Sequence, residues 1–272
     1  MSEIQDEKKI KDMRVDEVPE MKYNIEKDRV YKGDKVSRFL EIFASVLKYS
    51  NYRPVLEHYI KVSAKCSRCS VACHVYQASG DPKDIPCWRS ELLLSVYRRY
   101  FSVESSMYGR IFGGFELTEE HIDQMADSFW KCTACRKCVL ECPMGIDHGM
   151  ITHLGRYILA EMNLAPRALV ISTREQLHGA TQNTSAIPFV ALEDSLEFLE
   201  EEIEETHGVK VKFPIDKPDA DYIFFAPVSD YMMEAETLMG IAVVMHAAGA
   251  SWTIGSKFYD AINYGLFYSD LV

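Results

Sequence analysis

The cysteines are the residues whose type and spacing point most directly to chemistry. All eight lie between Cys66 and Cys142. The second group reads Cys132-x2-Cys135-x2-Cys138-x3-Cys142, followed by proline. Thiolates at this spacing are typical ligands of iron–sulfur clusters, and in proteins with two clusters the fourth cysteine binds the other cluster. A tight loop can place three sulfur atoms around one face of a cube but cannot bring a fourth to the opposite corner. The spacing therefore predicts a cluster here and a second one nearby.

The first group lacks a cysteine at the corresponding first position. When the two groups are aligned on their last cysteines, Cys73 takes the place of the crossing ligand, and Cys69 and Cys66 take the third and second places. The first place falls on Ser63, which leaves the set one thiolate short. Cys87 is the one cysteine not otherwise used, so we expect it to replace the missing ligand.

This assignment uses every cysteine once and predicts two [4Fe-4S] clusters. The expected ligands are Cys66, Cys69, Cys87 and Cys142 for cluster 1, and Cys132, Cys135, Cys138 and Cys73 for cluster 2. An alternative is that Cys87 is a free buried thiol and that cluster 1 is a three-iron or labile site. A structural zinc site is a further alternative, although zinc sites usually draw ligands from two separated pairs. We expect His74, next to Cys73, to be packed or hydrogen-bonded rather than a ligand, and we assign no catalytic residue.

Basic residues flank both groups of cysteines. They are Lys65, Arg68, Arg89, Lys131, Arg136 and Lys137. Positive charge near the sulfur atoms would raise a cluster's reduction potential. The alternative is that these side chains face water or a partner protein.

The bulk composition limits the location and the partners. The chain has 272 residues and a net charge of −11, which argues against nucleic acid because phosphate binding needs clustered Lys and Arg. No stretch approaches the roughly 18 apolar residues of a spanning helix, and the N-terminus has no apolar signal region. Eight cysteines in a cytosolic chain indicate metal binding rather than disulfides. We expect a cytoplasmic protein that reaches a membrane only through partners.

The elements that must position the cysteines are predicted to be helices. Residues 1–34 form a charged, flexible arm, and residues 35–165 form an all-helical domain that holds both clusters. Helices are predicted over 35–50, 55–65, 88–101, 118–130 and 148–162, with the cysteine loops between them.

The remainder of the chain changes character. Residues 166–218 are predicted to form a linker with a short helix and a strongly acidic helix over 192–206. Residues 219–272 contain a buried strand over 222–226, a helix over 233–248 and a strand over 251–254, which is one βαβ unit of a parallel sheet. The predicted fold class is α+β, with the helical domain followed by a partial α/β domain.

Two stretches resemble heterodisulfide-reductase-like iron–sulfur subunits of the DsrK/HdrD type. The segment CTACRKCVLECPMGIDHG resembles their dicluster ferredoxin domain. The segments KPDADYIFFAPVSDYM and MHAAGASWTIGSKFYDAINYG resemble the first half of their CCG domain. The turn over 226–229 and the segment 256–258 lack the cysteines that the family's CCG modules carry, so this half-domain cannot build the disulfide-reducing cluster.

The resemblance implies an electron-transfer subunit of a multi-subunit, membrane-associated oxidoreductase. Its expected partners are a membrane cytochrome b or quinone-interacting subunit and a thiol–disulfide or CCG-type subunit. An alternative is a catalytic subunit that reduces heterodisulfides or protein disulfides and whose CCG centre lies beyond residue 272. A third reading is an interaction module without redox function.

Overall fold

A computed structural model describes residues 33–102 and 113–267 of the chain. The arm predicted over residues 1–34 lies almost entirely outside these ranges. The chain divides into two compact units, which are described separately. Unit 1 comprises residues up to Arg167 together with those from Gly265 onward, and unit 2 runs from Ala168 to Tyr264.

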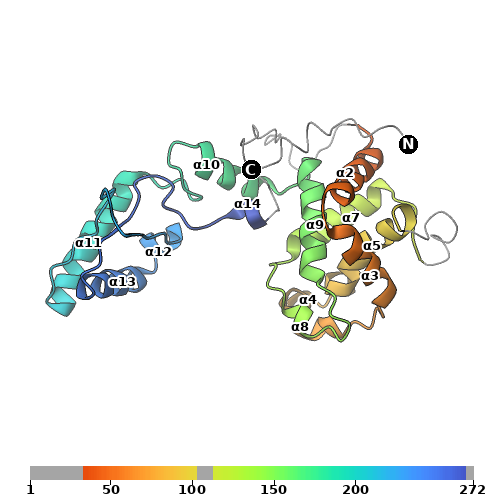
Figure 1. Cartoon of the computed structure of the whole chain (residues 1–272), viewed down its shortest axis with the longest axis horizontal. Helices are drawn as coiled ribbons and strands as arrows, with labels where there is room; N and C mark the ends of the chain where they lie inside the picture. The colour runs from red at the N-terminus through yellow and green to blue at the C-terminus, as the bar shows by residue number, and fades with distance from the viewer. Residues whose placement is uncertain (1–32, 103–112, 268–272) are drawn as a thin grey trace. The chain divides into compact units, whose positions relative to one another are not determined.

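Unit 1 is built from amphipathic helices around an apolar core. The longer helices are α2 (Lys35–Tyr49), α3 (Tyr52–Val62), α5 (Pro86–Tyr100), α7 (Glu119–Lys131) and α9 (His148–Glu161). Helix α9 packs against α2, α5 and α7 (Figure 1). Their inward faces supply fully buried side chains such as Phe43, Leu93, Phe129 and Ile158. Burial of these apolar stripes, rather than helix propensity, supplies most of the stability of such helices.

Local signals fix where these helices begin. Asp147 accepts a hydrogen bond from the backbone N–H of Met150 and caps α9, and Thr118 forms a capping box at the start of α7. Pro86 opens α5 in the first turn, where its missing N–H costs nothing. Helix α5 therefore begins beside Cys87, and the start of α9 closely follows Cys142.

Short helical segments carry or adjoin the cysteines. They are η1 (Arg68–Ala72), α4 (His74–Ser79), η2 (Pro82–Asp84) and α8 (Lys137–Leu140). Segments η1 and α8, one from each cysteine loop, pack against each other. This contact brings the two loops side by side although they are far apart in the sequence.

Unit 2 contains a small parallel sheet with helices. Its elements are α10 (Arg167–His178), α11 (Phe189–His207), β1 (Tyr222–Ile223), α12 (Val228–Met232), α13 (Ala235–Ala247) and β2 (Trp252–Thr253), and α14 (Tyr264–Phe267) closes the described chain at the boundary between the units. Strands β1 and β2 pair in parallel, with Tyr222 opposite Trp252. Helix α11 buries Leu196, Leu199 and Ile203 and leaves its acidic face to solvent. The mostly helical chain with a parallel strand pair confirms the predicted α+β class.

Details of unit 2 differ from the sequence prediction. The strand predicted over 222–226 is shorter, and its two residues Tyr222 and Ile223 are exposed rather than buried. Their side chains lie outside the apolar core of unit 2, whereas Phe224 and Ala226, which follow them, pack in it. The helix predicted over 233–248 is preceded by a separate short helix, α12, and α10 occupies the start of the predicted linker.

Candidate metal centre

The two cysteine loops have the same backbone conformation. Lys65 and Ser67 in the first loop have left-handed φ angles of 50° and 58°. The corresponding residues of the second loop, Ala134 and Arg136, have φ angles of 56° and 58°. This conformation is uncommon for residues other than glycine, so its repetition in the same register supports the alignment of the two motifs.

The hydrogen bonds that close the loops also correspond. The backbone N–H of Cys73 donates to the carbonyl of Ser70 at 3.3 Å, and that of Cys142 donates to the carbonyl of Val139 at 3.2 Å. Ser63 ends α3 as its C-cap, as Cys132 ends α7. The serine therefore occupies the position of the first cysteine without any change in the chain path.

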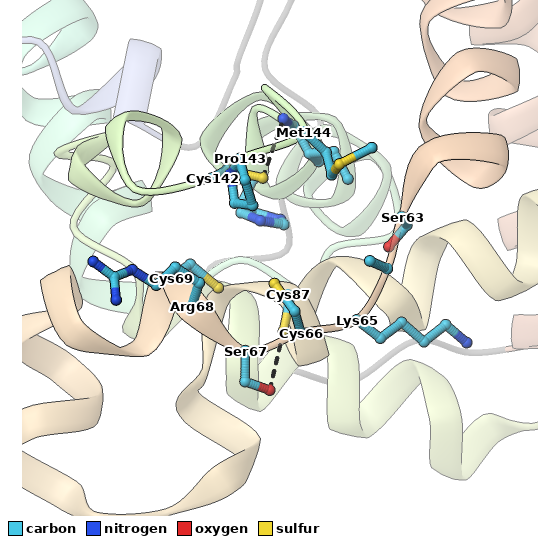
Figure 2. A pocket seen from close by; sticks show the side chains of 13 residues that line it. Ser63, Lys65, Cys66, Ser67, Arg68, Cys69, Cys87, Cys142, Pro143 and Met144 are labelled. Atoms are coloured by element: carbon cyan, nitrogen blue, oxygen red, sulfur yellow. Dashed lines mark hydrogen bonds between the residues drawn. The ribbon is translucent and has the colours of Figure 1, made fainter.

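The structure brings the four residues predicted for cluster 1 to one pocket. Cys66, Cys69, Cys87 and Cys142 all line it, and Ser63 lies in the same wall (Figure 2). Cys66 and Cys69 come from the first loop, Cys87 comes from the first turn of α5, and Cys142 crosses over from the second loop. Four thiols from three chain segments thus face one space.

The sulfur atoms in this pocket interact directly. A hydrogen bond between the Cys69 and Cys87 side chains raises the pKa of the Cys69 thiol and lowers that of Cys87 to about 6. The Ser67 hydroxyl lies 3.7 Å from the Cys87 sulfur and also favours its thiolate (Figure 2). The hydrogen bond shows that the sulfur atom of Cys87 lies beside that of Cys69.

The residues predicted for cluster 2 also lie close together. Burial, together with negative charge on Cys132, Cys135 and Cys73, raises the pKa of the Cys138 thiol to about 12. Such mutual repulsion among sulfur atoms requires that they be neighbours. Cys73 crosses to this group from the first loop, as Cys142 crosses to the other. A cation or a metal cluster would relieve this repulsion.

Backbone amides donate hydrogen bonds to the first and to the last cysteine of the second motif. The N–H of Ala134 donates to the Cys132 sulfur at 3.4 Å, and the N–H of Ile146 donates to the Cys142 sulfur at 3.4 Å. Amide donors of this kind stabilise thiolates and tune the potentials of iron–sulfur clusters. The donor set and its hydrogen bonds fit four-thiolate clusters. In the described ranges, no three Cys, His, Asp or Glu side chains converge on a single-ion position.

Most of the flanking basic residues are engaged by carboxylates of the same chain. Lys65 pairs with Glu91 at 2.8 Å, Arg68 with Glu141 at 3.4 Å and Lys131 with Asp84 at 3.4 Å. The first pair ties the first loop to α5, the second joins the two loops, and the third joins α7 to η2. Arg136 pairs likewise with Asp147, the residue that caps α9. The cations therefore help to hold the loops in place.

Two histidines near the loops have separate roles. The His74 Nε2 atom lies 3.1 Å from the hydroxyl of Thr133 and so links the two loops. This is consistent with its predicted role as a hydrogen-bonded residue. His148 lines the cluster 1 pocket, and its Nδ1 lies 2.9 Å from the hydroxyl of Ser90. Burial lowers the pKa of His148 to about 4, so its imidazole is uncharged at neutral pH.

Sequence reasoning missed one buried residue beside the second loop. Arg156 on α9 is completely buried and donates hydrogen bonds to the carbonyl oxygens of Phe129 and Cys132. A signal was available, because Arg156 lies on the helix face that also carries Thr152 and Leu159, which are buried. A charged side chain on a buried helix face indicates that a polar group in the protein interior binds it.

Comparison with known proteins identifies the class of this site. Residues 64–146 match the family described as 4Fe-4S dicluster domain. This segment contains the eight cysteines, both loops and the helices between them. The segment that carries the eight cysteines is therefore similar to the dicluster domains of iron–sulfur proteins.

Curated relatives narrow the comparison further. The chain is 33% identical over 176 residues to "Hdr-like menaquinol oxidoreductase iron-sulfur subunit 2" of Archaeoglobus fulgidus. It is 32% identical over 173 residues to the "Hdr-like menaquinol oxidoreductase iron-sulfur subunit" of Archaeoglobus profundus. Each match covers 64% of this chain and 31% of the relative, so the chain spans about a third of the length of either protein. No solved structure matches significantly.

These matches confirm the resemblance to heterodisulfide-reductase-like iron–sulfur subunits that the sequence indicated. None of the helices in the described part of the chain is both long and apolar enough to cross a membrane.

Proposed function

We propose that the chain relays single electrons through two [4Fe-4S] clusters within a multi-subunit oxidoreductase. The observation that carries this proposal is the grouping of the thiols. Four of them face one pocket, the other four lie close enough to repel one another as thiolates, and the two loops that carry them are packed together. When bound, such clusters supply reversible one-electron chemistry.

The proposed ligands follow the crossing pattern. Cys66, Cys69, Cys87 and Cys142 would hold cluster 1, and Cys132, Cys135, Cys138 and Cys73 would hold cluster 2. The third cysteines of the two motifs, Cys69 and Cys138, are close enough to affect each other's charge. This proximity supports exchange of electrons between the two sites without an intervening cofactor.

The surface beside the loops supports contact with a redox partner. Cys66 and Cys135 are exposed, so an electron can reach each proposed cluster from outside. Leu140 on α8 is 87% exposed and Val71 on η1 is 55% exposed. These two residues occupy equivalent places in the two loops, and exposed apolar side chains beside a functional site often mark an interaction surface.

The relatives' names support redox partners within a complex. Both relatives are named as subunits of a menaquinol oxidoreductase. We propose a membrane cytochrome b or quinone-interacting subunit on one side of the relay, and a thiol–disulfide or CCG-type subunit on the other. The protein would then be cytoplasmic and held at the membrane through its partners.

Unit 2 would provide a CCG-like half-domain for assembly rather than for catalysis. Its parallel strand pair and connecting helices support this assignment. At the turn where the family's modules carry a cysteine, the N–H of Val228 donates instead to the carboxylate of Asp260 at 3.0 Å. Asp260 also accepts from Thr184 and Ile262, so it links three segments of unit 2.

The test is metal analysis of the 272-residue chain purified without oxygen. We expect about eight irons and eight acid-labile sulfides per chain, and interacting EPR signals after reduction with dithionite. Zinc in place of iron would overturn the electron-transfer proposal. About four irons would contradict the two-cluster assignment and leave only one set of four thiols filled.

A further inference from the structure

A buried arginine lies directly behind the proposed site of cluster 2. The Arg156 guanidinium donates to the Phe129 carbonyl oxygen at 2.8 Å from Nη2 and at 3.0 Å from Nε. Nη2 also donates to the carbonyl oxygen of Cys132, the first ligand of the second motif. The guanidinium lies 5.3 Å from the ring centroid of Trp130, and the side chain is 0% exposed.

Arg156 remains a cation at this position. An arginine guanidinium stays protonated in proteins, so this side chain carries its charge in the protein interior. Its hydrogen bond to the Cys132 carbonyl oxygen places that charge beside a proposed ligand of cluster 2. A charge buried in protein is screened far less by solvent and salt than one on the surface.

A second buried arginine reaches the other end of the same ligand set. Arg89 on α5 donates to the backbone carbonyl of Asp84 at 3.2 Å, and the Cys73 sulfur lies 3.8 Å from the same oxygen. Arg89 also donates to the Ser128 hydroxyl on α7 at 3.1 Å. Arg89 is also close enough to His148, in the cluster 1 pocket, to lower the pKa of that imidazole, so the contrast between the two sites rests on Arg156.

The cluster 1 pocket has a different lining. Its buried ionisable side chain other than cysteine is His148, which is uncharged at neutral pH. The basic residues in its wall, Lys65 and Arg68, are both more than half exposed and both paired with carboxylates. Solvent and these carboxylates weaken their effect on the pocket.

We propose that Arg156 raises the reduction potential of cluster 2 above that of cluster 1, so that an electron entering the pair comes to rest on cluster 2. Reduction adds one negative charge to a cluster, and a fixed buried cation nearby stabilises that added charge. Arg156 is a positioning residue here, since it contacts a ligand's backbone and not the metal. The inference rests on the proposed pair of clusters and adds an order of potentials to it.

The experiment is an EPR-monitored redox titration of the full chain and its variants. Each signal is first assigned with Cys66→Ser, which affects cluster 1. In the wild-type chain we expect cluster 2 to have the higher midpoint potential. Arg156→Gln should shift the potential of cluster 2 to a more negative value and shift that of cluster 1 less. Arg156→Lys keeps the charge but cannot bridge two carbonyl oxygens, so its shift should be smaller.

Arg98→Gln is the matched control. Arg98 is also buried, but its guanidinium pairs with Glu91 at 2.8 Å, away from the cluster 2 ligands. Arg98→Gln should therefore leave the reduction potential of cluster 2 unchanged. Equal shifts of both clusters, an unshifted cluster 2 in Arg156→Gln, or a higher potential for cluster 1 in the wild type would overturn the inference.

Two further outcomes separate this inference from the function on which it rests. Loss of cluster 2 in both Arg156 variants would show that the guanidinium serves assembly rather than potential, which also overturns the inference. Absence of iron from the wild-type chain would instead be a failure of the proposed function. Iron content measured on every sample distinguishes these cases.

Discussion

The two cysteine loops of unit 1 share a backbone conformation but not the same cysteine positions. Both have left-handed residues at equivalent positions, and both close on equivalent hydrogen bonds. The second loop carries its first cysteine, Cys132, at the end of α7, whereas the first loop carries Ser63 at the end of α3. The thiol that joins the first group comes instead from Cys87 on α5.

This difference shows that ligand position and loop conformation are separable. The loop path depends on backbone angles and hydrogen bonds, none of which needs a cysteine at the first position. The thiol can therefore come from any neighbouring element whose side chain reaches the same pocket. Helix α5 meets that condition because its first turn lies against the first loop.

The largest expected effect comes from removing the relocated thiol. Cys87→Ser should reduce the iron content from about eight to about four per chain, because cluster 1 loses one of its four ligands. Cys73→Ser is the matched variant and should cost the other cluster. Iron analysis with EPR of the reduced proteins measures both. Retention of both clusters in Cys87→Ser would refute the relocation.

Moving the thiol from position 87 back to position 63 tests the same comparison between the loops. Adding Ser63→Cys to Cys87→Ser should restore about eight irons per chain, because Ser63 stands where Cys132 stands in the other loop. The added thiol would follow the spacing of the second motif. If iron stayed near four in the double variant, then the equivalence of the two loops would be limited to their backbones.

A smaller effect is expected where the second loop depends on close helix packing. A Cβ added at Gly155 on α9 would lie 2.0 Å from the Phe129 ring on α7. Gly155→Ala should therefore lower the free energy of unfolding by about 1–3 kcal/mol through overpacking. Denaturant unfolding measures this change. Gly240→Ala on α13 meets nothing within 4 Å and should be neutral or slightly stabilising.

The smallest effect concerns the left-handed residues themselves. Ala134→Gly should raise the free energy of unfolding by about 0.5–1 kcal/mol, since glycine adopts this conformation without steric cost. Iron content should stay unchanged. A decrease in the free energy of unfolding would contradict this expectation, because it would show that alanine adopts the left-handed φ angle here without steric cost.

The cysteine pattern by itself was enough to predict iron–sulfur chemistry. The spacing from Cys132 to Cys142 identified the motif, and counting thiols suggested a role for Cys87. The helices of unit 1 were also predictable from their apolar periodicity and from caps such as Thr118. These features are local, since a few neighbouring residues determine a loop's ligand geometry or the start of a helix.

The exposed strand β1 could not be predicted in the same way. Its run of aromatic and β-branched residues indicates a buried strand, but burial depends on which strands and helices lie beside it. Neither Tyr222 nor Ile223 belongs to the apolar core of unit 2. The same apolar sequence is therefore exposed for a reason that lies outside the strand.

The sequence alone determined the number of thiols, their spacing and the helical character of the segments between them. Only the tertiary structure placed Cys87 in a pocket with Cys66, Cys69 and Cys142, and it alone placed Arg156 against Cys132. Spacing is a property of one segment, whereas these contacts join α5 or α9 to loops that are distant in sequence. They depend on how the helices pack around the core of unit 1.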